Sequence, residues 1–255
     1  SFDDALKEAQ DLGLAEADPT MDVDGTDAAQ KASILSALAF NTPFDFKSVS
    51  YGGIESVSSE DILYAEQLGY SIKHIAYGSI DGNEVNISAY PTLVSKDQLL
   101  SQVGQQMNAL EIYCEGIGST VYYGPGAGPK PTASAVIADL VDISNGGWPD
   151  TPNKKNKNKL CKEGKQTFSR YFNLNVKNEA GAIAKVSSLF AEKNISIEAL
   201  IQKESKSNKN AQLNVPVIII SGPLSDMDAF QMQDNLDSME EISGIPKQFR
   251  IQNAL

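Results

Sequence analysis

The chain has 255 residues, 41% of them hydrophobic, which is typical of one large or two ordinary globular domains. Its formal net charge of −12 argues against a nucleic-acid partner, because an acidic surface repels phosphate backbones. No run approaches the roughly 18 apolar residues of a membrane span, and no signal peptide is visible, so we expect no membrane partner.

Cysteine and histidine are scarce. Cys114 and Cys161, the only cysteines, lie far apart without a CxxC pattern, which disfavours a disulfide framework or a zinc site and favours a reducing, cytoplasmic setting. The single histidine, His74, excludes a local histidine-pair metal site. It lies in an apolar, strand-like stretch, so we expect it to have a structural role.

Helix signals come first along the chain. Residues 2–12 fit a short helix, and an acidic loop with turn residues follows over 16–25. Thr26 can cap a second helix, whose apolar positions include Ala28, Leu35 and Leu38. The pattern Ser58-x-x-Asp61 is a capping box that predicts a third helix.

Strand-like alternation follows over 70–90, with Val85, Ile87 and Ala89 on one face and polar residues on the other. Two shorter runs, at 109–114 and 120–123, also predict strands. A glycine- and proline-rich loop over 124–131 then leads into a helix.

Between 145 and 168 this order is lost, and Gly, Pro, Asn and Lys dominate. We assign 148–169 to a linker. Its lysine-dense stretch, 154–165, is either a solvated part of that linker, which we favour, or a polyanion-binding patch.

After the linker the periodic pattern restarts and predicts the element order βαββαβ, a ferredoxin-like arrangement. Strand-like segments lie at 171–176, 195–201, 215–220 and 249–251, with helical spacing at 183–190 and again after the capping pattern Ser225-x-x-Asp228. The predicted fold class is therefore α+β: a mixed-sheet region with helices, followed by a βαββαβ domain.

The acidic loop is the first candidate for chemistry, because mutually repelling carboxylates favour a cationic partner. One possible partner is a metal ion, but an EF-hand calcium loop is excluded, because Thr20 and Lys31 stand where acidic ligands are required. An ammonium group, on a substrate or on a side chain, is the other possible partner. Asp27 and Lys31 lie four residues apart on the predicted helix, so the simplest alternative is an ordinary surface ion pair.

Two blocks of sequence resemble homoserine dehydrogenases. The first runs from Gly13-x-Ala15-Glu16-Ala17-Asp18-Pro19 through Asp22-x-x-Gly25-x-Asp27-Ala28-x-x-Lys31. The second is Tyr122-Tyr123-Gly124-Pro125-Gly126-Ala127-Gly128-Pro129-Lys130-Pro131-Thr132-Ala133-Ser134-Ala135-Val136. The resemblance implies a substrate-binding, catalytic and dimerisation region at 1–117 and a segment at 118–147 that returns to a nucleotide-binding domain absent from this chain.

The resemblance also implies an activity: NAD(P)-dependent interconversion of L-aspartate 4-semialdehyde and L-homoserine, in threonine and methionine biosynthesis. Lys31 matches the family's proton-transferring lysine and Asp27 its acidic partner, which also helps bind substrate. Glu16 and Asp22 match carboxylates that receive the substrate's ammonium and hydroxyl groups. The matched cofactor-lining glycines are Gly13, Gly124, Gly126 and Gly128.

The glycine block is not a dinucleotide fingerprint in its own right, because Pro129 occupies the place of the last glycine of GxGxxG. A tight turn before a helix is the alternative role for each glycine. Without a nucleotide-binding domain we expect no bound cofactor and no turnover by this chain alone.

Residues 170–255 resemble an ACT domain, an amino-acid sensor. Asn178-Glu179-Ala180-Gly181-Ala182-Ile183 matches its first strand–helix turn, with Ala180 where proline is usual. The resemblance implies L-threonine as effector, held by Asn178, Gly181, Ala182 and Ile183, and a homodimer or tetramer. Two alternatives to an enzyme fragment stay open: a sensing module without catalysis, and a domain used only for dimerisation.

Overall fold

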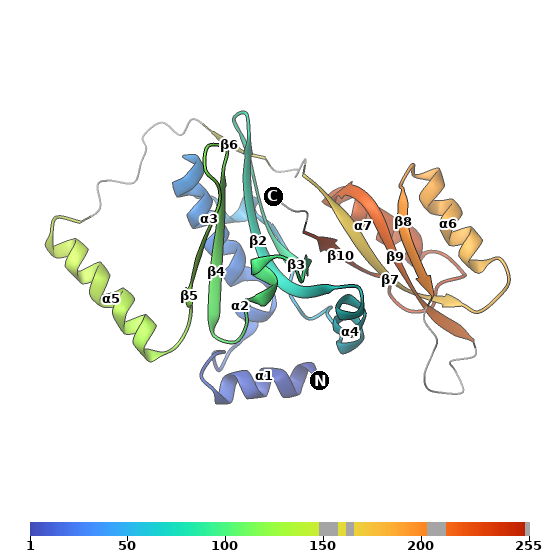
Figure 1. The fold of residues 1–255 in the computed structure, drawn as a ribbon, viewed down its shortest axis with the longest axis horizontal. Helices are drawn as coiled ribbons and strands as arrows, with labels where there is room; N and C mark the ends of the chain where they lie inside the picture. Colours follow the sequence, from blue (N-terminus) through green and yellow to red (C-terminus); the bar gives the residue numbers. More distant parts are fainter. Residues whose placement is uncertain (148–157, 162–165, 203–212, 253–255) are drawn as a thin grey trace.

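The computed structural model describes residues 1–147, 158–161, 166–202 and 213–252. These residues form an α+β fold on a mixed sheet of eight strands, and a two-stranded hairpin lies apart from that sheet (Figure 1). The expected mixed-sheet α+β class is confirmed. The eight-stranded sheet is continuous through both halves of the chain.

Short polar side chains cap two helices of the first half, whereas the helix that Thr26 was expected to cap has Gly25 at its N-cap instead. Ser1 caps α1 (Phe2–Asp11) with a capping box, and Ser58 caps α4 (Ser59–Gln67) in the same way through Asp61, as the sequence predicts. The other helical elements are α2 (Thr20–Val23), α3 (Thr26–Phe40), η1 (Phe46–Ser48), η2 (Leu99–Gln102) and α5 (Pro129–Ser144).

Strand β3 (Glu84–Ser95) organises the first half. Its whole length pairs antiparallel with β2 (Tyr70–Asp81) along one edge. Three short strands share the opposite edge end to end, all parallel to β3: β6 (Lys159–Leu160), β1 (Ser50–Tyr51) and β10 (Lys247–Ile251). Asn86 and Ser88 are buried along with the apolar Val85, Ile87 and Ala89, so both faces of this part of β3 are covered.

Helix α3 packs on β2 and β3 through small residues. Its buried positions are Ala29, Ala32, Ser33 and Ser36, and a Cβ placed on Gly78 of β2 would lie 2.5 Å from the Ser36 hydroxyl. Leu35 and Leu38, two of the expected apolar positions, are 44% and 54% exposed. The close approach of helix and sheet explains why small residues, rather than leucines, occupy the interface.

The small unit (residues 167–252) has the predicted βαββαβ order. It comprises β7 (Thr167–Lys177), α6 (Ala182–Glu192), β8 (Ile197–Gln202), β9 (Asn214–Ser225), α7 (Asp226–Asp237) and β10. The strands lie side by side as β10-β7-β9-β8, with each neighbouring pair antiparallel, which is the ferredoxin-like order. Ser225 caps α7, as predicted, and Val186, Phe190, Met232 and Leu236 fill the core.

The two halves share a hydrophobic cluster. Leu93 of β3 and Ala65 of α4 pack with Tyr171, Ile218 and Phe249 of the small unit. Much of the predicted linker, at 148–157 and 162–165, lies outside the described residues. Its described parts are more regular than expected, since Lys159–Leu160 forms β6 and β7 begins at Thr167.

Strands β4 (Met107–Cys114) and β5 (Gly118–Pro125) form the hairpin that leads into α5. Figure 1 shows α5 standing apart from the eight-stranded sheet. None of its residues is buried, and one stripe of large apolar side chains is exposed: Val136, Ile137, Leu140, Val141 and Ile143. Such a stripe is typical of a helix that packs against another domain or subunit.

Candidate functional site

The amino-terminal turn of α3 carries the predicted catalytic pair. Lys31 Nζ lies 2.5 Å from Asp27 Oδ2, across one helical turn, as the four-residue spacing predicts. Their side chains are 61% and 38% exposed, so the pair faces solvent and is open to a small molecule. Asp27 lies in the first turn of the helix, where the helix dipole favours its negative charge.

The carboxylates before α3 divide into two groups. Asp18 Oδ1 accepts hydrogen bonds from the backbone N–H and the hydroxyl of Thr20, and these bonds lower the pKa of Asp18. Asp24 Oδ1 accepts the N–H of Thr26 at 2.8 Å. Both therefore shape turns. Within the described part of the chain, the carboxylates of Glu16 and Asp22 accept no hydrogen bond and form no ion pair with Lys31, which pairs with Asp27.

The four predicted cofactor glycines differ in their surroundings. A Cβ on Gly124 would meet nothing within 4 Å, and one on Gly128 would meet only Pro131 Cδ, at 3.9 Å. Their backbones are therefore open to a ligand, and Gly128, with φ +109°, is the N-cap of α5. Packing within the chain explains why residue 126 is a glycine, because a Cβ there would lie 2.0 Å from the Asn108 amide. Gly13 ends the first helix region with φ +68°.

The predicted effector turn joins β7 to α6. Gly181 is the N-cap of α6 with φ +92°, a conformation that favours glycine. Asn178 donates its backbone N–H to Leu213 O at 2.8 Å, Ala182 is buried, and Ile183 packs against the core of the small unit. The structure thus gives Ala182 and Ile183 a packing role. Open space surrounds Gly181, where a Cβ would meet nothing within 4 Å.

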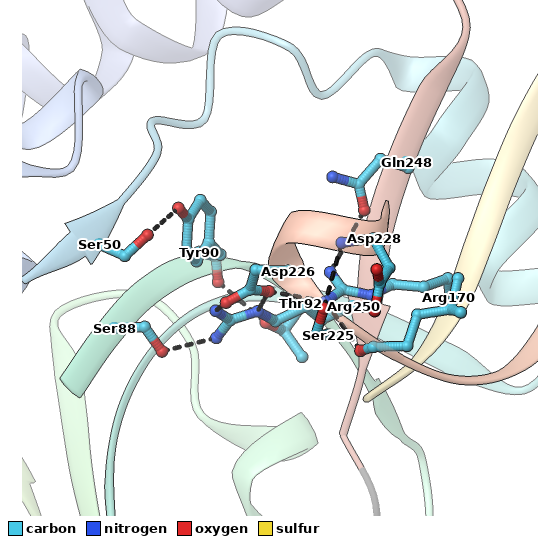
Figure 2. Close-up of polar contacts among 11 residues, drawn as sticks. Ser50, Ser88, Tyr90, Thr92, Arg170, Ser225, Asp226, Asp228, Gln248 and Arg250 are labelled. Atoms are coloured by element: carbon cyan, nitrogen blue, oxygen red, sulfur yellow. Dashed lines mark hydrogen bonds and ion pairs between the residues drawn. The ribbon is translucent and has the colours of Figure 1, made fainter. Parts of the chain in front are cut away.

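A buried ionic cluster that local sequence patterns did not predict joins the two halves (Figure 2). Asp226, the first residue of α7, accepts hydrogen bonds from Arg170 Nη2 at 2.6 Å and from Arg250 Nε at 2.9 Å. Arg250 also donates to Ser88 Oγ at 2.8 Å, and its guanidinium lies 4.3 Å from the centre of the Tyr90 ring. Burial opposes ionisation of Asp226, but the two arginines outweigh it and lower the pKa of this carboxyl.

A second polar contact between the halves centres on the fully buried Asp61. Its carboxylate accepts hydrogen bonds from Lys247 at 2.8 Å and from Asn173 at 2.6 Å, as well as from Ser58 in the capping box. Burial raises the pKa of Asp61, but these hydrogen bonds together lower it more, so its net pKa lies below the ordinary value. Asp61 therefore caps a helix of one half while holding two strands of the other.

The described residues contain no cluster of three or more His, Cys, Asp or Glu side chains placed to hold a metal ion. None of their helices is both long and apolar enough to cross a membrane.

Comparison with known proteins places this site in a family. The family profile for homoserine dehydrogenase matches residues 1–141, which include both sequence blocks and the Asp27–Lys31 pair. The chain belongs to the homoserine dehydrogenase family. The homoserine dehydrogenase of Neisseria gonorrhoeae is 42% identical over 213 residues, covering 80% of this chain and 49% of that protein. That of Bacillus subtilis is 34% identical over 259 residues, covering 98% of this chain and 58% of that protein.

Solved homoserine dehydrogenases share the fold as well as the sequence. The enzyme from Thiobacillus denitrificans superposes with a TM-score of 0.84 at 33% identity, over 99% of this chain and 58% of that one. The enzyme from S. aureus gives a TM-score of 0.68 at 32% identity, over 100% of this chain and 59% of that one. The chain thus spans between about half and three fifths of the length of these homoserine dehydrogenases.

Proposed function

We propose that this chain is the substrate-binding and regulatory part of an enzyme that interconverts L-aspartate 4-semialdehyde and L-homoserine with NAD(P). The observation that carries the proposal is the solvent-facing Asp27–Lys31 pair at the start of α3, preceded in the chain by the carboxylates of Glu16 and Asp22, in a chain of this family.

Lys31 supplies the positive charge and the proton that the reaction requires. When bound, the nicotinamide supplies the hydride that reduces the aldehyde carbon, and accepts it in the reverse direction. Lys31 donates its proton to the developing alkoxide and takes it back from the hydroxyl in reverse. Asp27 holds the ammonium group of Lys31 in place. Glu16 and Asp22, whose carboxylates accept no hydrogen bond from the described residues, bind the substrate's ammonium and hydroxyl groups.

The glycine loop before α5 would line the cofactor cleft. The open backbones at Gly124 and Gly128 fit the close approach of a dinucleotide, and Gly13 would approach it from the other side. We further propose that the apolar stripe of α5 packs against a nucleotide-binding domain, and that this chain alone neither binds NAD(P) tightly nor turns over.

The ferredoxin-like topology of the small unit favours a second function, amino-acid sensing by an ACT domain. Under this proposal the turn from Asn178 through Gly181 to Ile183 binds L-threonine at a contact between two subunits of a homodimer or tetramer. The left-handed backbone at Gly181 supports it, since backbone N–H groups at a helix start suit a carboxylate.

Calorimetric titration of this chain with L-homoserine and with L-threonine tests both functions. We expect homoserine to bind, and the Asp27→Ala variant to abolish binding. Threonine binding that survives Asp27→Ala but is lost in Gly181→Val would support the sensor. Homoserine binding unchanged in Asp27→Ala would contradict the proposed substrate site, and threonine binding unchanged in Gly181→Val would contradict the proposed effector site.

A further inference from the structure

The turn that starts α3 is in close contact with the loop after β1. Gly25 has φ +86° and is the N-cap of α3, two residues before Asp27. A Cβ on Gly25 would lie 2.8 Å from Gly52 O and 3.0 Å from His74 Cε1. The turn, the Gly52 backbone and the imidazole ring therefore touch one another, with no room for a side chain between them.

The same loop is anchored on two other sides. Gly52 donates its N–H to Ala89 O of β3 at 2.9 Å, which fixes the loop to the sheet. Ile54 donates its N–H to Val23 O, also at 2.9 Å, and this bond fixes the loop to the end of α2, the helix that carries Asp22. The contact on the Val23 side does not involve His74.

His74 completes the contact from β2. Its Nε2 lies 3.0 Å from Gly52 O, and because a carbonyl oxygen only accepts, Nε2 carries the proton. Burial lowers the pKa of His74, while the Gly52 hydrogen bond and the negative charge of Asp27 act in the opposite direction. The net result favours a neutral imidazole with a single N–H, directed at Gly52.

We propose that His74 is a positioning residue for the Asp27–Lys31 pair: its Nε2–H holds the Gly52 carbonyl against the Gly25 turn and so fixes the first turn of α3. This inference rests on the proposed dehydrogenase function. Lys31 is 61% exposed, so little packing fixes its side chain. The accuracy with which its ammonium meets the substrate must therefore come from Asp27 and from the backbone position of α3.

The test uses two polar variants in the complete enzyme, with this chain joined to its nucleotide-binding domain. In His74→Gln the amide nitrogen takes the place of Nε2 and can still donate to Gly52. In His74→Asn it takes the place of Nδ1 and falls short. We measure kcat, KM for L-homoserine and the midpoint of thermal unfolding for both variants and for the wild type.

We expect His74→Asn to lower kcat about 10-fold, the size of effect that a lost hydrogen bond with a small displacement produces. KM for L-homoserine should rise as well, because the loosened turn also carries Asp27 of the proposed substrate site. His74→Gln, which keeps the hydrogen bond to Gly52, should restore most of kcat. Equal kcat in the wild type and both variants would overturn the inference. It would also be overturned if His74→Gln lost as much kcat and as much thermal stability as His74→Asn. A wild-type enzyme without turnover would reject the dehydrogenase proposal itself, and the inference with it.

Discussion

Replacing Asp226 with Asn tests the buried cluster between the two halves most directly. Arg170 and Arg250 are 1% and 3% exposed, and Asp226 is the only carboxylate that pairs with them in the described structure. The variant keeps the size of the side chain and one acceptor oxygen but removes the negative charge. Two guanidinium groups would then lie buried without a counter-ion, so we expect a loss of about 3 to 5 kcal/mol in the free energy of unfolding.

Asp228→Asn is the matched control, because Asp228 lies in the same first turn of α7 but is exposed. A loss of about 0.3 to 1 kcal/mol is expected there, mainly from the helix dipole. Urea denaturation of this chain, followed by far-ultraviolet circular dichroism, measures both variants. If Asp226→Asn cost no more than Asp228→Asn, the cluster would not stabilise the junction and our account of it would be wrong.

Two further predictions concern single residues. In the complete enzyme, Lys31→Met should lower kcat by about 100-fold or more, as expected for a lost proton-transfer group. Its thermal midpoint should change little, since the exposed pair contributes less than about 1 kcal/mol; an almost normal kcat would refute the role of Lys31. Asp61 has a folded-state pKa below its ordinary 3.8, so its stabilising contribution is present above about pH 4 and is lost as the pH falls through the folded pKa. Asp61→Asn should therefore be less stable at pH 7 and lose less stability on acidification, measured by urea denaturation at pH 7 and pH 3; an unchanged acid sensitivity would contradict this.

Local patterns predicted local structure well. The capping box at Ser58 and the capping serine at Ser225 begin helices where expected, because a hydroxyl three residues before a carboxylate satisfies free N–H groups wherever the segment lies. The βαββαβ order and the Asp27–Lys31 pair were also predictable, since both depend on periodicity within a few residues. The roles of Glu16, Asp22 and the effector turn remain predictions.

The contacts between the halves were not predictable from local patterns. Strands of two residues, such as β1 and β6, are too short to show alternation, and their parallel partners lie far away in sequence. The ionic cluster joins residues 56 positions apart, from Arg170 to Asp226. One signal was present: Arg170 precedes a run of buried aromatic residues, and Arg250 stands between Phe249 and Ile251, so each arginine lies in an apolar strand.

The shared edge of β3 has a consequence for how the chain is made. Leu93 emerges from the ribosome about 160 residues before its neighbour Ile251. At 5 to 20 residues per second, roughly 10 to 30 seconds pass while this edge of β3, on the side away from β2, has no partner at Thr92 and Leu93. An open strand edge pairs readily with other chains. The newborn protein therefore passes through a period of vulnerability to aggregation that ends only when β10 has been translated and added beside β3.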